Sequence, residues 1–377
     1  MEAAACSCRS PCLTLERTIM KIGFIGLPKS GKTTLFNALT GSSVQVSAFP
    51  TGCLGPNLAS VKVIDERVEK LSAIYKPQRQ VYPAIDIVDL AGVNEGGTRS
   101  EAFSSELMKL ARTVDALSVV LRNFQSEATS WPAPLEDLEK IEQELLLADL
   151  IIAEKRLEKV EVGLKKGGNG NGVSGLKAEQ QVLQLVVKAL NEGRPLRELE
   201  FNENQQVLSR CFQFLTQKPA MVILNSDEAS AGKNQDILQA ISQKYQSVEF
   251  AGQLEMELSR LDEESARAFM ADLGIKESAK DRLISLAYQT LGYISFFTVG
   301  PDEVRAWNVR RGATALEAAA TIHTDLAHGF ITAECFNYDD LIAAGSDKEV
   351  RSNGKFRLVG KDYIVRDRDI LSIRFHI

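Results

Sequence analysis

Short apolar runs alternate with amphipathic stretches along most of the chain. The first run, MKIGFIG at 20–26, is followed by KTTLFNALT, whose apolar residues recur at helical spacing. Further apolar runs lie at 84–89, 116–121, 220–225 and 247–252. Because helical segments separate several of them, the pattern predicts an α/β fold: a mostly parallel sheet with helices on both faces.

Two heptad seams interrupt this alternation. The first runs in steps of four and three through Leu146, Leu150, Ala153, Leu157, Val160 and Leu164. After the glycine-rich KKGGNGNGVSG, the second runs through Leu176, Leu183, Val187 and Leu190 and ends at NEGRP, a helix stop. We therefore expect an antiparallel helical hairpin inserted in the sheet domain. The hairpin either contacts a partner or packs only on its own domain.

Strand-like runs dominate the region after Gly292. YISFFTVG, EVRAWNVRRG and DYIVRDRDILSIRFHI predict strands around one short helix, a small α+β module. The predicted parts are a disordered extension at 1–19, a sheet domain at 20–136 and 199–291, the hairpin at 137–198, and the module at 292–377.

Composition narrows the class of protein. A chain of 377 residues with 44% hydrophobic and 25% charged residues is typical of a soluble protein of two or three domains. A net charge of −6 excludes a generic polyanion binder, so nucleic-acid contact requires a local basic patch. No apolar run approaches the ~18–20 residues of a membrane span. We expect a monomer without membrane contact or DNA sequence specificity.

Cysteines and the first residues bear on location. Cys6, Cys8 and Cys12 are close enough in the sequence to bind a metal or sense redox state. No histidine is near to complete a ligand set, so we favour the interpretation that they do neither. The remaining cysteines are scattered, which suits a reduced cytosolic protein. Residues 1–19 lack the apolar core of a secretory signal. A transit peptide remains an alternative interpretation of this segment. We expect folding to begin at Met20.

A glycine-rich loop lies between the first predicted strand and helix. Gly26, Gly31, Lys32 and Thr33 match G-x-x-x-x-G-K-[ST], in which loop N–H groups surround phosphate oxygens. In this motif the lysine reaches the β- and γ-phosphates and the hydroxyl binds Mg²⁺. The predicted nucleotide-binding residues here are Leu27, Pro28, Lys29, Ser30, Gly31, Lys32, Thr33 and Thr34.

Two later strand ends add candidate residues. Asp89 ends a strand, where it can support the Mg²⁺ shell, and the N–H of Gly92 can meet a γ-phosphate. Asn225 and Glu228, in VILNSDE, leave another strand where a base would lie. Guanine-specific relatives have N-K-x-D at this place, so glutamate and serine here argue against guanine readout.

Together these residues resemble the YchF family of Obg-like ATPases. The resemblance covers Met20 to Ile377, including segments 55–77, 144–161, 254–293, 303–312, 322–334 and 360–371. It implies an ATPase domain interrupted by an antiparallel coiled coil, then a TGS module of β-grasp fold. It also implies ATP preference over GTP and ribosome association, with a role in translation or stress regulation.

Several positions depart from the family pattern. Lys29 replaces an asparagine that helps hold potassium in some related NTPases. We hypothesise that its ammonium supplies this charge; the alternative is that it points to water. Gly52 and Cys53 replace paired threonines of the first switch loop, and a thiol is a poor Mg²⁺ ligand. Thr51 is a candidate substitute.

Further departures concern water and the base. Val93 lies where Ras-like enzymes have a water-orienting glutamine, which the family also lacks, and Val119 fills the slot of a family histidine. Ala251 and Gly252 stand at the base-side S-A motif. Phosphate-binding residues persist, so we expect ATP binding with slow Mg²⁺-dependent hydrolysis. A GTP-binding protein and a nucleotide-binding scaffold with negligible hydrolysis remain the alternatives.

The C-terminal region carries basic and aromatic residues. Arg305, Arg310 and Arg311 can contact phosphates, and Trp307 can stack on a base if it is exposed. A core tryptophan with solvated arginines is the simpler interpretation, whereas the resemblance to TGS modules favours RNA or ribosome contact. For His323 and His328 we expect helix capping or packing.

Overall fold

The computed structural model describes residues 20–41, 57–90, 103–125, 131–166, 171–272, 275 and 277–376. The chain divides into two compact units. The large unit consists of Met20–Val61 and Ile85–Leu291. The C-terminal unit combines Gly292–Ile377 with Lys62–Ala84 from the first part of the chain. The sequence pattern predicts that residues 62–84 belong to the sheet domain at 20–136, whereas the structure groups them with the C-terminal region.

The sheet of the large unit has the strand order β2-β4-β1-β5-β6-β7. All registered neighbours from β4 to β7 pair in parallel, which confirms the predicted mostly parallel sheet. The strands are β1 (Met20–Ile25), β2 (Asn57–Lys62), β4 (Ala84–Asp89), β5 (Ala116–Asn123), β6 (Ala220–Ser226) and β7 (Gln246–Phe250).

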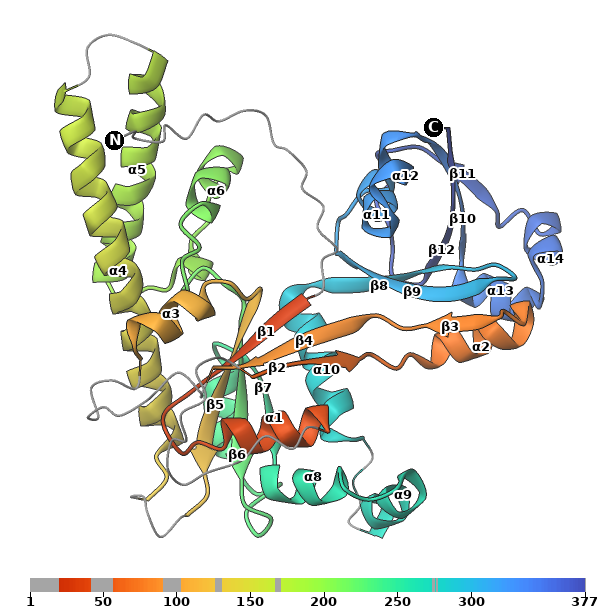
Figure 1. Cartoon of the computed structure of the whole chain (residues 1–377), viewed down its shortest axis with the longest axis horizontal. Helices are drawn as coiled ribbons and strands as arrows, with labels where there is room; N and C mark the ends of the chain where they lie inside the picture. The colour runs from red at the N-terminus through yellow and green to blue at the C-terminus, as the bar shows by residue number, and fades with distance from the viewer. Residues whose placement is uncertain are drawn as a thin grey trace. The chain divides into compact units, whose positions relative to one another are not determined.

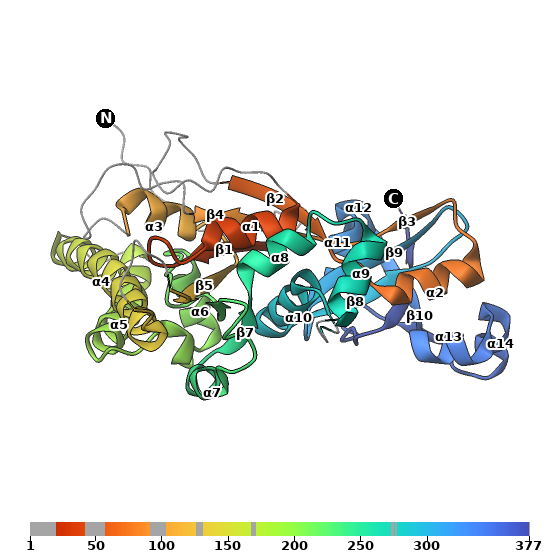
Figure 2. The ribbon, with the colours of Figure 1, turned by 90° about the horizontal axis from the view of Figure 1, so that it is seen from below.

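Helices cover both faces of this sheet because its strands are apolar on both sides. The helices α3 (Ser105–Ala111), α4 (Pro134–Lys166) and α7 (Gln235–Ser242) pack on one face, around Leu117, Val119 and Val222. On the other face, α1 (Lys32–Thr40) and α10 (Ala279–Leu291) meet Ile22 and Ile85. The helix α8 (Gly252–Leu258) lies beside α1 (Figure 2). The unit also contains η3 (Leu196–Glu198), α6 (Glu203–Arg210) and α9 (Glu263–Asp272).

The predicted hairpin consists of α4 and α5 (Asn171–Asn191), which lie side by side (Figure 1). All ten seam residues belong to one apolar cluster between the two helices and the segment that follows them. The first turns of α4 pack instead against the sheet, through Leu138, Ile141 and Leu145. One continuous helix therefore joins the sheet core to the arm.

A buried carboxylate marks the point where α4 leaves the sheet. Asp149 is 0% exposed, and its oxygens accept hydrogen bonds from the N–H groups of Leu215 and Thr216 at 3.0 and 2.8 Å. Arg112, at the end of α3, forms an ion pair with it at 2.8 Å. Because a buried carboxylate is costly without such partners, this cluster fixes the base of the arm on the sheet.

The C-terminal unit contains a second six-stranded sheet, in the order β11-β10-β12-β8-β9-β3. β8 and β9 form an antiparallel hairpin, and β12 runs parallel to β8. Its strands are β3 (Arg79–Val81), β8 (Tyr293–Thr298), β9 (Glu303–Arg310), β10 (Phe330–Asn337), β11 (Arg357–Val359) and β12 (Asp369–Phe375). Its helices are α2 (Glu66–Tyr75), α11 (Ala315–Ile322), α12 (Thr324–His328), α13 (Tyr338–Ala344) and α14 (Asp347–Ser352).

Residues 62–84 complete this unit. Val68 and Leu71 of α2 are 0% exposed and pack with Phe297 and Val304 of the sheet, on the face opposite α11. β3 adds a parallel edge strand to β9. An amphipathic helix must bury its apolar stripe, and α2 buries it here.

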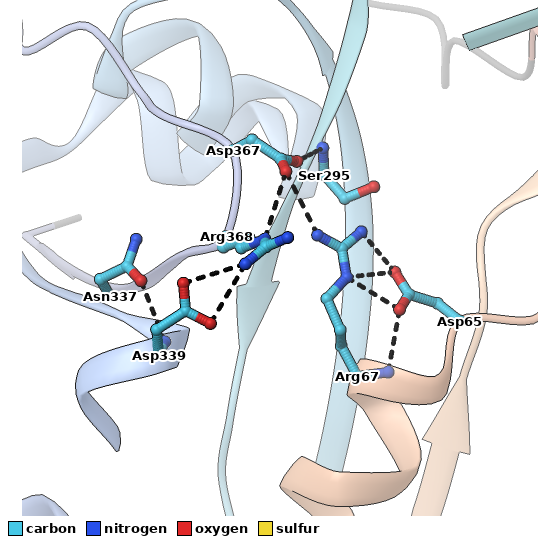
Figure 3. A network of polar contacts seen from close by, with 7 residues as sticks. All are labelled: Asp65, Arg67, Ser295, Asn337, Asp339, Asp367 and Arg368. Atoms are coloured by element: carbon cyan, nitrogen blue, oxygen red, sulfur yellow. Dashed lines mark hydrogen bonds and ion pairs between the residues drawn. The ribbon is translucent and has the colours of Figure 1, made fainter. Parts of the chain in front are cut away.

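Polar contacts strengthen the same junction (Figure 3). Arg67 of α2 pairs with its neighbour Asp65 at 2.7 Å and reaches Asp367, before β12, at 3.4 Å. Asp367 also accepts the N–H of Ser295 at 3.0 Å. The α2 segment is thus tied to β8 and β12 by charge as well as by apolar packing.

Trp307 and His323 in the C-terminal unit both form contacts within the unit. Trp307 donates its indole N–H to Thr298 at 2.9 Å, stacks on Phe296, and is covered by the guanidinium of Arg305 at 3.8 Å. These contacts favour the simpler interpretation of a packed tryptophan. His323 accepts the N–H of Asp325 and caps α12, as expected.

Among the described residues, no helix is long and apolar enough to cross a membrane. The same residues contain no group of three or more His, Cys, Asp or Glu side chains that could hold a metal. Cys6, Cys8 and Cys12 lie outside the described residues.

Candidate functional site

The loop from Gly26 to Gly31 joins β1 to α1, as the sequence predicts. A Cβ on Gly26 would lie 2.5 Å from the carbonyl oxygen of Val120, so the loop passes β5 too closely for any side chain. Gly31 has φ 90°, in the left-handed region, and a Cβ there would lie 2.1 Å from Nδ2 of Asn225. Both glycines are therefore required by close approach.

Between the glycines, the loop side chains differ in exposure. Ser30 is buried, Leu27 is half-buried, and Pro28 and Lys29 are exposed. Lys29 has φ 63°, which is uncommon for a residue with a side chain. Thr34 is half-buried in the first turn of α1.

Lys32 is the first residue of α1, and it is 6% exposed. Its ammonium donates to the carbonyl oxygens of Gly26 at 3.0 Å and Leu27 at 2.9 Å. Burial lowers the pKa of Lys32 to about 8, although the carboxylate of Asp89 raises it in part. An anion in the loop would favour the charged ammonium, because opposite charge offsets the cost of burial.

Thr33 and Asp89 meet next to this lysine. The Thr33 hydroxyl donates to Oδ2 of Asp89 at 2.8 Å, and Asp89 is 0% exposed at the end of β4. Asn57, the first residue of β2, donates to the same oxygen at 3.4 Å. A hydroxyl and a carboxylate are hard oxygen donors of the kind that Mg²⁺ prefers, so the donor set fits this ion.

Asn225 bridges two loops that are far apart in the sequence. Its Nδ2 donates to the carbonyl oxygen of Ser30 at 3.0 Å, and its Oδ1 accepts the N–H of Gly252 at 3.0 Å. Ala251 is the N-cap of α8 and is buried beside it. Asn225 thus holds the glycine loop against the β7–α8 connection.

The other predicted residues lie apart from this cluster or cannot be placed. Glu228 is exposed in the turn after β6. Val119 is buried in the core of the sheet. Gly92 lies outside the described residues, as do Thr51, Gly52, Cys53 and Val93.

Two residues of this region escaped the sequence analysis. Asn57 contacts Asp89, yet it belongs to no phosphate-binding motif, and only its place at the start of a strand could have suggested it. Glu249, near the end of β7, accepts hydrogen bonds from the turn that carries Glu228. No local spacing links Glu249 to that turn, because the contact depends on how β6 and β7 pair.

Fold and site together define the class of protein. A strand–glycine loop–helix unit with a buried lysine, and a threonine hydroxyl bonded to an aspartate on the neighbouring strand, are the parts of a P-loop nucleoside triphosphatase. Two family models match the chain. One, YchF-GTPase_C, described as a protein of unknown function (DUF933), matches residues 293–376. The other, described as a 50S ribosome-binding GTPase, matches residues 21–156.

Individual relatives cover nearly the whole chain. The chain is 34% identical over 366 residues to the ribosome-binding ATPase YchF of Bacillus subtilis, covering 94% of this chain and 99% of the relative. It is 35% identical over 365 residues to the ribosome-binding ATPase YchF of Escherichia coli O157:H7, with 95% and 99% covered. The structure of the Schizosaccharomyces pombe YchF GTPase aligns with a TM-score of 0.81 at 29% identity, covering 94% and 98%. The chain belongs to the YchF family.

Proposed function

We propose that this chain is a cytosolic ATPase that binds Mg²⁺·ATP in the glycine loop and hydrolyses it slowly. The observation that carries the proposal is the contact between Thr33 and the buried Asp89 at 2.8 Å, beside the buried ammonium of Lys32. A cation and a pair of hard oxygen donors at the start of a helix suit a triphosphate with its metal ion.

The roles of the residues follow from their positions. The N–H groups of the loop and the Lys32 ammonium stabilise negative charge on the phosphates. Thr33 would hold Mg²⁺ directly and Asp89 would support its water ligands, and the ion supplies charge neutralisation when bound. Asn57 orients the Asp89 carboxylate. No described side chain in the cluster is a candidate for positioning the attacking water, which is consistent with slow turnover.

The choice of purine depends on the turn after β6. Asn225 uses both ends of its amide to bridge the two loops, so Glu228 is the remaining candidate for contact with the base. The names of the relatives differ on this point, since the bacterial proteins are called ATPases and the yeast protein a GTPase. We favour ATP because glutamate and serine replace the residues of guanine readout.

Competition of a fluorescent adenine nucleotide by ATP and GTP, with Mg²⁺ present, tests binding and preference together. We expect tighter binding of ATP, and loss of binding in Lys32→Ala. The matched control is Lys109→Ala, which removes an exposed lysine of α3 and should change nothing. Tighter GTP binding, or full binding by Lys32→Ala, would contradict the proposal.

Single-turnover hydrolysis tests the enzymatic part. A rate above background that falls in Thr33→Val and returns in Thr33→Ser supports the metal role of the hydroxyl. No rate above background, with or without ribosomes, would instead favour a nucleotide-binding scaffold.

We further propose that the protein acts on ribosomes as a regulator of translation or of a stress response. The bacterial relatives are named ribosome-binding, and one matching family model is described in the same words. The arm and the C-terminal unit are the elements that we propose as contact surfaces, for the ribosome or for RNA. We also propose that the chain is a monomer. Ribosome binding can be checked by sedimenting the full chain with ribosomes in the presence of ATP, of ADP or of no nucleotide. Pelleting no greater than that of serum albumin would contradict the proposal.

A further inference from the structure

We propose that Glu249 is a positioning residue for purine selection, because it holds the turn that carries Glu228. This inference rests on the proposed function, since it concerns the base end of the same nucleotide site. Glu249 is the penultimate residue of β7, pairs in register with Leu224 of β6, and is half-buried.

Both carboxylate oxygens of Glu249 accept hydrogen bonds from the neighbouring turn. Oε1 accepts from the Ser226 hydroxyl at 2.5 Å and from Nδ2 of Asn234 at 2.6 Å. Oε2 accepts from the backbone N–H of Gly232 at 2.9 Å. Asn123, at the end of β5, donates to the Ser226 hydroxyl at 3.0 Å. The end of β6, the turn after it and the N-cap of α7 therefore meet at the carboxylate of Glu249, and the end of β5 joins them through the Ser226 hydroxyl.

The turn has its own internal bonds as well. The Asp227 carboxylate accepts from the N–H and hydroxyl of Ser230 at 2.7 and 2.6 Å. The Asn234 amide also donates to the carbonyl oxygen of Ser230 at 2.8 Å. The turn is thus a compact body, and its bonds to Glu249 set its position on the sheet. Glu228 belongs to this turn and is exposed. Among the described residues, its side chain forms no hydrogen bond within the turn.

The same region is tied to the phosphate loop. Asn225 precedes Ser226 directly, and it bridges Ser30 and Gly252. A change at Glu249 should leave this bridge in place, since neither of the two hydrogen bonds that form it ends on the Glu249 carboxylate. We therefore expect Glu249 to affect the base end and to spare the phosphate end.

Selection between adenine and guanine needs a fixed carboxylate. Both purines present N–H donors that a mobile glutamate can reach, so discrimination comes from holding the acceptor where only one pattern fits. Hydrogen bonds to a charged group are among the stronger ones, and three of them end on Glu249. Removing the charge frees the turn and lets Glu228 adapt to either base.

The test is competition of a fluorescent adenine nucleotide by ATP, GTP and inorganic tripolyphosphate, in the full chain. In Glu249→Gln we expect the preference for ATP over GTP to fall by on the order of 10-fold, with tripolyphosphate binding unchanged. The control is Glu257→Gln, an exposed glutamate of the nearby α8. Should Glu249→Gln fail to fold, Ser226→Ala removes one bond to the same carboxylate and should lower the preference less.

A double-mutant cycle shows whether Glu249 acts through Glu228. In the Glu228→Gln background, Glu249→Gln should cause no further change in preference. An unchanged preference in both Glu249→Gln and Ser226→Ala would overturn the inference and leave the proposed function intact. Equal wild-type affinity for ATP and GTP would overturn it as well, and absence of any nucleotide binding would overturn both.

Discussion

The proposed phosphate end and the proposed base end of the nucleotide site are built in opposite ways. At the phosphate end, eight consecutive residues from Gly26 to Thr33 supply the loop, the lysine and the hydroxyl. At the base end, Asn123, Ser226 and Glu249 come from three strands and meet only through the sheet. The first is a local backbone structure that needs glycine, whereas the second is a set of long-range side-chain contacts. Substitutions should therefore affect triphosphate affinity at one end and purine preference at the other.

Gly31→Ala should have the largest effect. The added Cβ would lie 2.1 Å from Nδ2 of Asn225, and the alanine would have to adopt φ 90°. Both the glycine loop and the Asn225 bridge are therefore displaced. We expect affinity for ATP, GTP and tripolyphosphate to fall together by about 100-fold, or ~3 kcal/mol. Calorimetric titration measures this.

Gly41→Ala is the control for backbone strain alone. Gly41 has φ 66°, but nothing lies within 4 Å of its missing Cβ. If Gly41→Ala weakened binding as much as Gly31→Ala, strain and not the contact with Asn225 would be the cause.

Asn225→Ala should affect both ends, less strongly. It leaves the carbonyl of Ser30 and the N–H of Gly252 without their bridging partner, and unsatisfied buried groups cost ~1–3 kcal/mol each. We expect about 10-fold weaker binding of both nucleotides and a lower melting temperature. Asn225→Asp keeps an acceptor for Gly252 and tests which half of the bridge matters. Binding that stays at the wild-type level in both variants would show that the bridge is dispensable.

The pH dependence of binding should belong to the phosphate end alone. Burial lowers the pKa of Lys32 to about 8. Below that pH the ammonium is present and affinity should be flat; above it the free protein loses the proton, so affinity falls by up to about tenfold per pH unit. ATP and tripolyphosphate should show the same fall in titrations from pH 6.5 to 9.5. Lys32→Arg, whose guanidinium stays charged, should abolish the slope. A slope that persists in this variant would assign it to another group.

Lys29 should have the smallest effect, limited to turnover. We hypothesise that its ammonium replaces a potassium ion, so hydrolysis in potassium and sodium should agree within about twofold. Asparagine tolerates the left-handed φ of 63° that Lys29 adopts. The variant Lys29→Asn should therefore fold normally and make hydrolysis depend on potassium. Hydrolysis by the unchanged protein that rises steeply with potassium would rule this out.

Much of the fold could be predicted from local patterns. The apolar runs predicted the parallel sheet, and the two heptad seams between Leu146 and Leu190 predicted the two helices of the arm. The structure agrees, because all the seam residues pack in one apolar cluster. The α2 segment could not be assigned in this way. Its periodicity shows an apolar face, but the partner of that face is a sheet more than 200 residues later, around Phe297.

The sequence by itself determined the phosphate loop, because Gly26, Gly31, Lys32 and Thr33 act through a backbone that folds within a few residues. Only the tertiary structure decided that Asn225 bridges two loops, that Asn57 meets Asp89, and that Glu249 holds the turn of Glu228. Those contacts depend on which strands lie side by side and in which register. Strand order and register arise from packing of the whole sheet, and the spacing of residues along the chain does not encode them locally.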